Sequence, residues 1–386
     1  MPNKNLTKKV TRDGADHTRA ARKSVKTGRP VTLADVAQEA GVAVGTASRV
    51  LNNAANVKPD ARLRVMEAVA RLNYRRLRVR GGNRTLARRL AEHPRNIGLV
   101  LLGMDETLVH VPVLTEVLHG VDMAVTGING NLLFANLPKG DRVPPFLKNG
   151  GVEGLIMKTS QYFALPHPDT NPLVKRILRL PLVWVWAKPD NVPGDVCSFD
   201  SDKVAVIAAK HLRDRGHTHV GFINPKLGKS SFERIKREFQ FACQARSVQV
   251  TPIESSSERV AVWPEPALTG PGELIPLVDQ WLAMPKAQRP TALFVPADNI
   301  AVQVNVAFRE RGVQVGRDVS LISVNNEKSL IQMSSPMLTT IDINARDIGS
   351  RCVDQLLWRI AHPESLASQT ILLEPHLVEG SSVVQL

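Results

Sequence analysis

The sequence predicts a chain of two parts, a small all-α head and a large α/β body built on parallel sheets. The net positive charge lies entirely in residues 1–95, which hold 22 lysines and arginines against 7 acidic residues, whereas the remaining 291 residues have a net charge of −1. Short helical patterns fill the head, and apolar runs alternate with amphipathic stretches from Ile97 onward. A length of 386 residues also exceeds what one hydrophobic core usually organises.

Residues 1–28 are basic and contain few apolar side chains, which predicts a disordered arm. The charge asymmetry favours a nucleic-acid partner, because lysines and arginines that neutralise phosphates supply most sequence-independent affinity. A merely solvated tail would account for the arm but not for the patterned segment that follows it.

Three short helices are predicted after the arm. The first ends at Gly41, is capped by Thr32 and has Asp35 in its first turn, where a carboxylate suits the helix dipole. In the second, the predicted buried stripe is Ala43, Ala47, Val50 and Leu51, and the opposite face holds Val44, Gly45, Ser48, Arg49 and Asn52. The third runs from about Asp60 to Leu72, and its predicted apolar face is Leu63, Met66, Val69 and Ala70. Two short helices joined by a glycine turn are typical of a helix-turn-helix.

Residues 31–74 resemble the DNA-binding headpiece of the LacI family of transcription regulators almost position for position. The matching residues are Val31-Thr32-Leu33, Asp35-Val36-Ala37, Ala40-Gly41-Val42, Thr46, Ser48-Arg49-Val50, Asn52 and Asn73-Tyr74. The resemblance implies that the helix from Val44 to Asn52 enters the major groove of DNA.

Arg49 is the strongest candidate for reading a base, because a guanidinium can pair bidentately with guanine. Val44 and Gly45 occupy the family's variable specificity positions, where valine can touch a thymine methyl and glycine offers no side chain. The candidates for phosphate contacts are Thr32, Thr46, Ser48, Asn52 and Tyr74. Ala43 replaces the family's usual serine, which removes a hydroxyl that can cap the recognition helix, at a cost of about 0.5–2 kcal/mol.

The segment after Tyr74 resembles the family's hinge helix, which implies that Leu90 wedges into the minor groove. The distance from Tyr74 to this helix exceeds the family spacing by an extra basic, glycine-bearing piece. That piece either tracks phosphates or serves as a flexible spacer. The expected domains are the arm at 1–28, the headpiece at 29–76, the basic linker and hinge helix at 77–95, and the body at 96–386.

The body resembles the family's two-lobed, periplasmic-binding-protein-like domain, in which a ligand binds between the lobes at the carboxyl ends of strands. Its candidate effector-binding residues are Asp298, Asp200, Arg234, Trp186 and Asn326, with Trp184 and Asn325 as weaker candidates. Asp298 ranks first because it matches a family aspartate that binds sugar hydroxyls. Alternatively, the Asp298 carboxylate interacts only with the positive end of the helix dipole.

Two departures from the family bear on the effector. Glu233 stands where an effector-binding arginine is common, and the adjacent Arg234 replaces it only if the helix slips. Ile343 replaces a residue that is polar in several sugar-sensing members. The expected effector is a sugar or sugar derivative, but not an ordinary hexose.

An enzyme is not expected. Gly228-Lys229-Ser230 ends like a phosphate-binding loop, but the required glycine at position 223 is Ile223. We expect no cofactor and no metal. The separated cysteines Cys197, Cys243 and Cys352 indicate neither a zinc site nor a disulfide framework. The absence of a membrane span and of a signal peptide predicts a cytoplasmic, nucleoid-associated protein and argues against an exported solute-binding protein.

The sequence therefore predicts a sequence-specific transcription regulator, most simply a repressor, that binds a pseudo-palindromic DNA operator as a homodimer. A small molecule between the lobes would control operator affinity. No leucine heptad follows Ser382, so a coiled-coil tetramer is not expected. The alternative is a sequence-indifferent DNA anchor, which the sparse readers Val44 and Gly45 favour and Arg49 and Leu90 oppose.

Overall fold

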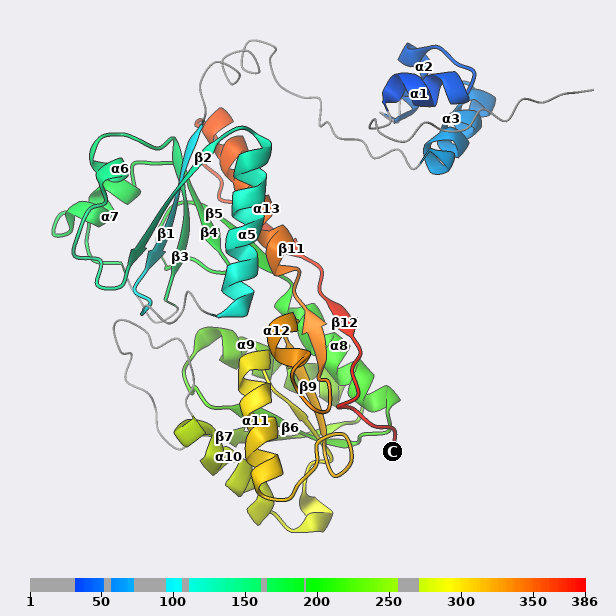
Figure 1. The fold of residues 1–386 in the computed structure, drawn as a ribbon, viewed down its shortest axis with the longest axis vertical. Coiled ribbons are helices and arrows are strands. Elements are labelled where there is room, and N and C mark those ends of the chain that lie inside the picture. Colours follow the sequence, from blue (N-terminus) through cyan, green and yellow to red (C-terminus); the bar gives the residue numbers. More distant parts are fainter. Residues whose placement is uncertain are drawn as a thin grey trace, which may run out of the picture. The chain divides into compact units, whose positions relative to one another are not determined.

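The computed structural model describes residues 32–51, 57–72, 95–105, 111–160, 165–190, 192–255 and 271–386. The chain forms two compact units, residues 1–84 and residues 85–386 (Figure 1). The predicted arm and hinge helix lie outside the described residues, as do Asn52, Tyr74 and Leu90. Among the described residues, no helix is long and apolar enough to cross a membrane.

The described residues of the first unit form three helices, α1 (Leu33–Glu39), α2 (Val44–Leu51) and α3 (Pro59–Arg71). Thr32 caps α1 as predicted: its hydroxyl accepts from the Asp35 amide, and the Asp35 carboxylate accepts from the Thr32 amide at 2.7 Å. This reciprocal pair satisfies two amides at the helix start. Gly41 turns the chain between α1 and α2 at a φ of 62°, which is favourable only for glycine. The predicted helix-turn-helix is confirmed.

Of the predicted apolar face of α3, Val69 packs against the core, but Leu63, Met66 and Ala70 are exposed. Leu63 and Met66 are 62% and 53% exposed, whereas the buried side chains of α3 are Ala61, Val65 and Ala68. Val65 and Ala68 form one hydrophobic cluster with Val36, Ala37, Ala40, Ala47 and Val50. Three short helices can approach closely only where the facing side chains are small, so the alanine-rich stripe faces inward. On α2, Ala47 and Val50 are buried as predicted, but Ala43 is exposed.

The first lobe of the body is a six-stranded sheet in the order β11-β5-β4-β3-β1-β2, and all its strand pairs are parallel. The strands are β1 (Asn96–Leu102), β2 (Asn131–Leu137), β3 (Gly154–Thr159), β4 (Leu182–Val185), β5 (Asp195–Phe199) and β11 (Thr370–Leu373). Its helices are α5 (Pro112–Gly127), α6 (Pro145–Lys148), α7 (Pro172–Ile177) and α13 (Ala345–Ala361).

The second lobe repeats this plan with the strand order β12-β10-β9-β8-β6-β7, in which only β12 is antiparallel to its neighbour. The strands are β6 (His219–Asn224), β7 (Gln249–Glu254), β8 (Ala292–Phe294), β9 (Ser320–Val324), β10 (Thr339–Asp342) and β12 (His376–Val378). The helices are α8 (Ser201–Asp214), α9 (Ser230–Gln244), α10 (Pro271–Ala283), α11 (Asp298–Glu310) and α12 (Lys328–Ile331). The two similar lobes with parallel sheets are confirmed.

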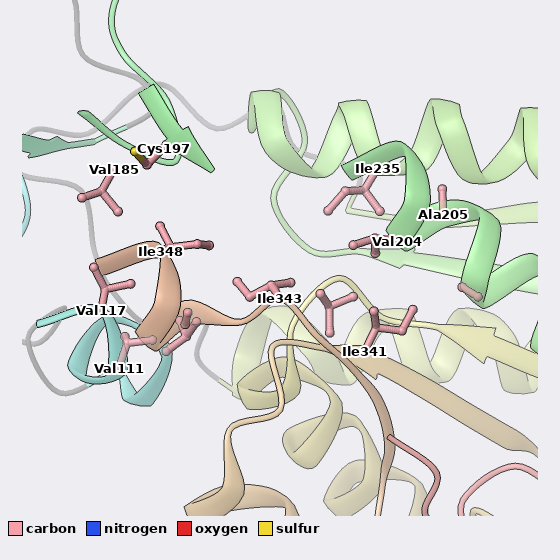
Figure 2. Packing of buried hydrophobic residues seen from close by; sticks show 14 of the residues in the cluster. Val111, Val117, Val185, Cys197, Val204, Ala205, Ile235, Ile341, Ile343 and Ile348 are labelled. Atoms are coloured by element: carbon pink, nitrogen blue, oxygen red, sulfur yellow. The ribbon is translucent and has the colours of Figure 1, made fainter. Parts of the chain in front are cut away.

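The chain crosses between the lobes three times: from β5 to α8, from β10 to α13, and from β11 to β12 (Figure 1). Ile343 lies on the second crossover, between Val117 and Ile348 of the first lobe and Val204 and Ile235 of the second (Figure 2). These side chains form one hydrophobic cluster that spans both lobes. The lobes therefore share a core at the hinge, and a change in their angle must repack it.

Helices α5 and α13 pack against each other at two glycines. A methyl group added at Gly120 would overlap the Arg346 carbonyl, and one added at Gly349 would overlap the Val117 carbonyl. Only glycine permits backbones to approach this closely. Because α13 continues directly from a crossover, this contact fixes α5 relative to the hinge.

A buried ion pair ties α13 to the strands of the first lobe. Asp195 is fully buried, accepts hydrogen bonds from Arg359 and from Gln355 at 2.6 Å, and accepts the Gln369 amide at 2.8 Å. Burial opposes ionisation of Asp195, but these hydrogen bonds outweigh it and hold its pKa below the usual value. The network joins β5, α13 and the start of β11.

Arg359→Ala should lower the free energy of unfolding by about 3–5 kcal/mol, because it leaves the buried Asp195 carboxylate without its cation. Urea unfolding followed by circular dichroism measures this loss. The control is Arg351→Ala on the same helix, whose exposed pairing with Asp354 should be worth less than about 1 kcal/mol. Equal losses in the two variants would contradict the assigned role of the Asp195 network.

Candidate functional site

The solvent face of α2 carries the side chains expected to read DNA. Val44, Gly45 and Arg49 are exposed, Thr46 and Ser48 are half-buried, and Ala47 and Val50 face the core. A methyl group at Gly45 would meet nothing within 4 Å, so packing inside the unit does not require glycine there. Val44, Gly45 and Arg49 are therefore exposed to solvent, as a recognition surface requires. The contacts of these residues with DNA remain predictions.

Some charged side chains of the head pair with each other. Arg71 of α3 pairs with Glu39 of α1 at 2.9 Å, and Arg64 pairs with Asp60 along α3 at 3.4 Å. The hydroxyl of Thr32 is held by Asp35, so a phosphate contact from Thr32 must accommodate the capping pair. The backbone carbonyl of Ala43 accepts hydrogen bonds from the amides of Thr46 and Ala47. The methyl side chain of Ala43 cannot cap the helix.

A cavity of about 500 Å³ lies in the body where the strands of both sheets end. The first lobe contributes residues that follow or end its strands, among them Met104, Lys158, Trp186 and Phe199. The second lobe contributes Lys226 after β6, Ala297 after β8 and Asn325 after β9. Carboxyl ends of parallel strands are where α/β folds bind ligands, and here two such edges face one space.

Four helices begin at this cavity. The starts of α5, α8, α9 and α11 supply the lining residues Val113, Ser201, Ser230, Ser231 and Asn299. Because the amino end of a helix carries partial positive charge, the cavity wall favours electron-rich ligand groups.

Three of the five expected effector residues line the cavity: Asp200, Arg234 and Trp186. Asn326 does not; its side-chain amide donates to Asp342 at 2.7 Å, and the preceding Asn325 lines the cavity instead. Both asparagines have positive φ, and this turn decides which side chain points into the space. Trp184 is fully buried, and its indole nitrogen donates to the Pro193 carbonyl at 2.9 Å.

Asp298 is fully buried beneath the cavity rather than lining it. Its carboxylate accepts hydrogen bonds from the hydroxyls of Ser323 and Thr340, the latter at 2.7 Å, and from the Glu327 amide at 2.7 Å. Burial raises the pKa of Asp298 to about 6, against the opposing effect of these hydrogen bonds. The carboxylate therefore lies outside the expected cavity wall, and its hydrogen bonds go to Ser323, Thr340 and the Glu327 amide rather than to the first amides of its own helix α11.

Glu327 joins the two lobes. One carboxylate oxygen accepts the amide of Val113, at the start of α5 in the first lobe, at 3.2 Å. The other accepts the amide of Asn299, at the start of α11 in the second lobe, at 3.0 Å. Burial raises the pKa of Glu327 to about 8, and the nearby charge of Asp298 adds to this effect. Sequence reasoning missed Glu327, since no motif marks it.

The helix α9 presents Arg234, and not Glu233, to the cavity. The Glu233 carboxylate instead accepts from Asn224 at 2.8 Å and pairs with Lys236 at 2.7 Å. Ile343, the second departure from the family pattern, does line the cavity. The polar family residue is therefore replaced by an apolar contact at the hinge.

Four lysines of the cavity wall were also missed: Lys158, Lys188, Lys226 and Lys229. Two of them, Lys226 and Lys229, belong to the segment GFINPKLGKS, which resembles a phosphate-binding loop only in its last three residues. The position of that segment between a strand and a helix is a usable signal, because such connections lie at the ligand edge of a sheet.

Known families match both parts of the chain. Residues 32–76 match "Bacterial regulatory proteins, lacI family", and residues 209–383 match "Periplasmic binding protein-like domain". The protein described as "HTH-type transcriptional repressor PurR" of Mannheimia succiniciproducens is 29% identical over 360 residues, covering 91% of this chain and 98% of the relative. The protein of the same description from Edwardsiella ictaluri is 29% identical over 358 residues, covering 91% and 96%.

Solved structures share the fold. The lac repressor dimer bound to operator and the anti-inducer ONPF has a TM-score of 0.56 at 22% identity, covering 92% of this chain and all of that chain. The complex of the transcriptional regulator CelR with cellobiose has a TM-score of 0.58 at 21% identity, with the same coverage. A LacI family regulator from Enterococcus faecium with bound ribose has a TM-score of 0.59 at 18% identity, covering 75% and 99%.

A helix-turn-helix head followed by a two-lobed binding body defines a DNA-binding transcription regulator with a ligand-binding domain, and not an enzyme. The head matches the lacI family of bacterial regulatory proteins, and over about nine-tenths of its length the chain is similar to relatives described as transcriptional repressors.

Glu327→Gln should change how stability depends on pH. A raised pKa means that the folded chain holds a proton which the unfolded chain releases above its usual pKa of 4.5. This contribution to stability is complete below pH 4.5 and is lost as the pH rises to about 8. The free energy of unfolding of the wild type, minus that of the variant, should therefore fall between pH 5 and pH 8.

Urea unfolding at several pH values measures this difference, with an upper limit of about 1.4 kcal/mol per pH unit. Histidines with lowered pKa, such as His217, have the opposite slope but are common to both proteins. Glu310→Gln, at the exposed end of α11, is the control and should leave the pH profile unchanged. A pH-independent difference for Glu327→Gln would show that Glu327 is ionised throughout.

Proposed function

We propose that this protein is a transcriptional repressor that binds a pseudo-palindromic operator as a homodimer and is controlled by a small molecule held between its two lobes. The observation that carries the proposal is the cavity at the facing carboxyl ends of two parallel sheets, in a chain that also has a helix-turn-helix head. Its site of action is the chromosomal DNA of the cytoplasm.

The polar groups of the cavity favour a sugar or sugar derivative as the effector. In the described part of the chain, Trp186 Nε1 and Asn299 Oδ1 are buried without a hydrogen-bond partner, and both residues line the cavity. One is a donor and the other an acceptor, and a hydroxyl can satisfy either. An indole face beside such groups also suits the apolar face of a sugar ring. Two structures with the same fold hold cellobiose and ribose.

The hinge supplies the coupling between ligand and DNA. A ligand can shift the angle between the lobes only if it binds one arrangement more tightly than another. The lobes are joined by three crossovers, by the cluster around Ile343 and by Glu327. Val113 is both a cavity residue and the partner of Glu327, so a ligand beside Val113 acts directly on this interlobe contact.

On DNA, the proposed recognition follows the exposed face of α2. Arg49 pairs with a guanine, Val44 contacts a thymine methyl, and Gly45 leaves its base without side-chain contact. The proposed phosphate contacts are Thr32, Thr46, Ser48, Asn52 and Tyr74, and Leu90 wedges into the minor groove. Two heads on one dimer then read two half-sites related by the protein's two-fold axis.

Arg49→Ala should abolish preference for one guanine in each half-site while binding to random DNA persists, because phosphate contacts are unaffected. Selection of genomic fragments with purified protein, followed by sequencing, identifies the operator, and titration of that operator measures the loss. A bidentate guanine contact predicts a loss of about 1–3 kcal/mol, or roughly 5-fold to 150-fold.

Arg64→Ala is the matched control, since it removes an exposed head arginine from α3 and should keep the guanine preference. The proposal is supported if the wild type and Arg64→Ala enrich a pseudo-palindrome with the fixed guanine and Arg49→Ala does not. If wild-type protein enriches no motif, the head is a sequence-indifferent DNA anchor and the proposal fails.

A further inference from the structure

The connection between β6 and α9 supplies a compact group of polar residues to the cavity. Asn224 ends the strand, Ser230 begins the helix, and Lys226, Lys229, Ser230 and Ser231 all line the cavity. The Lys226 amide donates to the Asn224 side chain at 3.1 Å, and the Lys229 amide donates to the Lys226 carbonyl at 3.1 Å. The connection is therefore a folded turn that holds both lysines at the carboxyl edge of the sheet.

The start of α9 adds a helix terminus to these side chains. The helix has 15 residues, and its N-cap residue is Lys229, which forms no side-chain capping hydrogen bond. The Lys229 ammonium lies 4.7 Å from the centre of the Phe232 ring, which holds it over the first turn. Arg234, one turn further along, also lines the cavity.

Positive charge exceeds negative charge on the described cavity wall. The cationic lining residues are Lys158, Lys188, Lys226, Lys229 and Arg234, and the acidic ones are Asp200 and Asp202. Asp200 also caps α8 by accepting the amides of Asp202 and Lys203, both at 3.1 Å. Lys158 and Lys226 are only 6% and 3% exposed, so their charges lie where few water molecules screen them.

Two of the five cations, Lys158 and Lys188, belong to the first lobe. The Lys188 ammonium donates to the carbonyls of Val192 and Gly194, at 3.0 and 3.3 Å. The Lys158 ammonium donates to the Thr159 carbonyl and lies 5.5 Å from the Trp186 ring. The remaining three, Lys226, Lys229 and Arg234, belong to the β6–α9 connection and the first two turns of α9.

We propose that the effector carries an anionic group, a phosphate or a carboxylate, which binds at the start of α9 against Lys226, Lys229 and Arg234. The inference rests on the proposed function, because it takes this cavity as the effector site. The partial positive charge at the amino end of α9 adds to the three cations, and this combination suits anions in general. Trp186 and Asn299 contact the neutral, hydroxyl-bearing part of the same ligand.

The anion site is tested first with inorganic phosphate and the full-length protein. Calorimetric titration at constant ionic strength, with chloride as the reference anion, should show millimolar phosphate binding to the wild type. Lys229→Gln/Arg234→Gln should weaken it at least 10-fold. Neither replaced side chain is buried, so the variant should fold, and circular dichroism verifies this. Lys175→Gln, at an exposed position of α7, is the control and should bind like the wild type.

Equal phosphate affinity in wild type and double variant, or wild-type affinity no greater than that for chloride, overturns the anion site. A second series compares glucose 6-phosphate, glucuronate and glucose in the same titration, which separates phosphate from carboxylate as the anionic group. Tighter binding of either anionic sugar than of glucose supports the inference, and tighter binding of glucose overturns it.

Operator titrations with the same compounds separate the two proposals. If glucose alters operator affinity and no anion binds, the anion site fails and control by a cavity ligand stands. If phosphate binds at the start of α9 and operator affinity never responds to any sugar that binds, the anion site stands and the control function fails.

Discussion

The arrangement of the body depends on one carboxylate held between two helix ends. Glu327 accepts an amide at the start of α5 and another at the start of α11, so one side chain serves both lobes. The Glu327 amide in turn donates to Asp298, whose carboxylate also binds Ser323 and Thr340 at the ends of neighbouring strands. A rotation that moves α5 away from Glu327 must break the hydrogen bond from the Val113 amide.

The cavity lies directly on this hinge. Ile343 and Val111 belong to the hydrophobic cluster between the lobes (Figure 2) and also line the cavity. Val113 and Asn299 line the cavity too, and their backbone amides donate to Glu327. A bound molecule therefore changes the environment of the groups that set the angle between the lobes. The cationic start of α9 lies on the same wall, so charge on the ligand would act across the same hinge.

Much of this architecture could be predicted from the sequence, because buried parallel strands appear as continuous apolar runs and the capped first helix has a clear signature. The directions of individual side chains could not be predicted from the sequence. Arg234 and not Glu233, and Asn325 and not Asn326, face the cavity, because helix phase and a left-handed turn decide each choice. The face of α3 was mispredicted because Leu63 and Met66 looked more apolar than the small residues that actually fit the core. Glu327 accepts the amide of Val113, 214 positions away in the sequence, and local patterns do not report such a contact.

The central claim is that DNA binding and the angle between the lobes are coupled. Because coupling is reciprocal, operator DNA must change the distribution of lobe arrangements even when the effector is unknown. Spin labels on cysteines introduced at the exposed Lys175 of α7 and Arg309 of α11 report the interlobe distance, and the native cysteines are buried. Pulsed electron spin resonance should show a distance distribution that shifts when the selected operator is added. Superimposable distributions with and without operator would contradict the account.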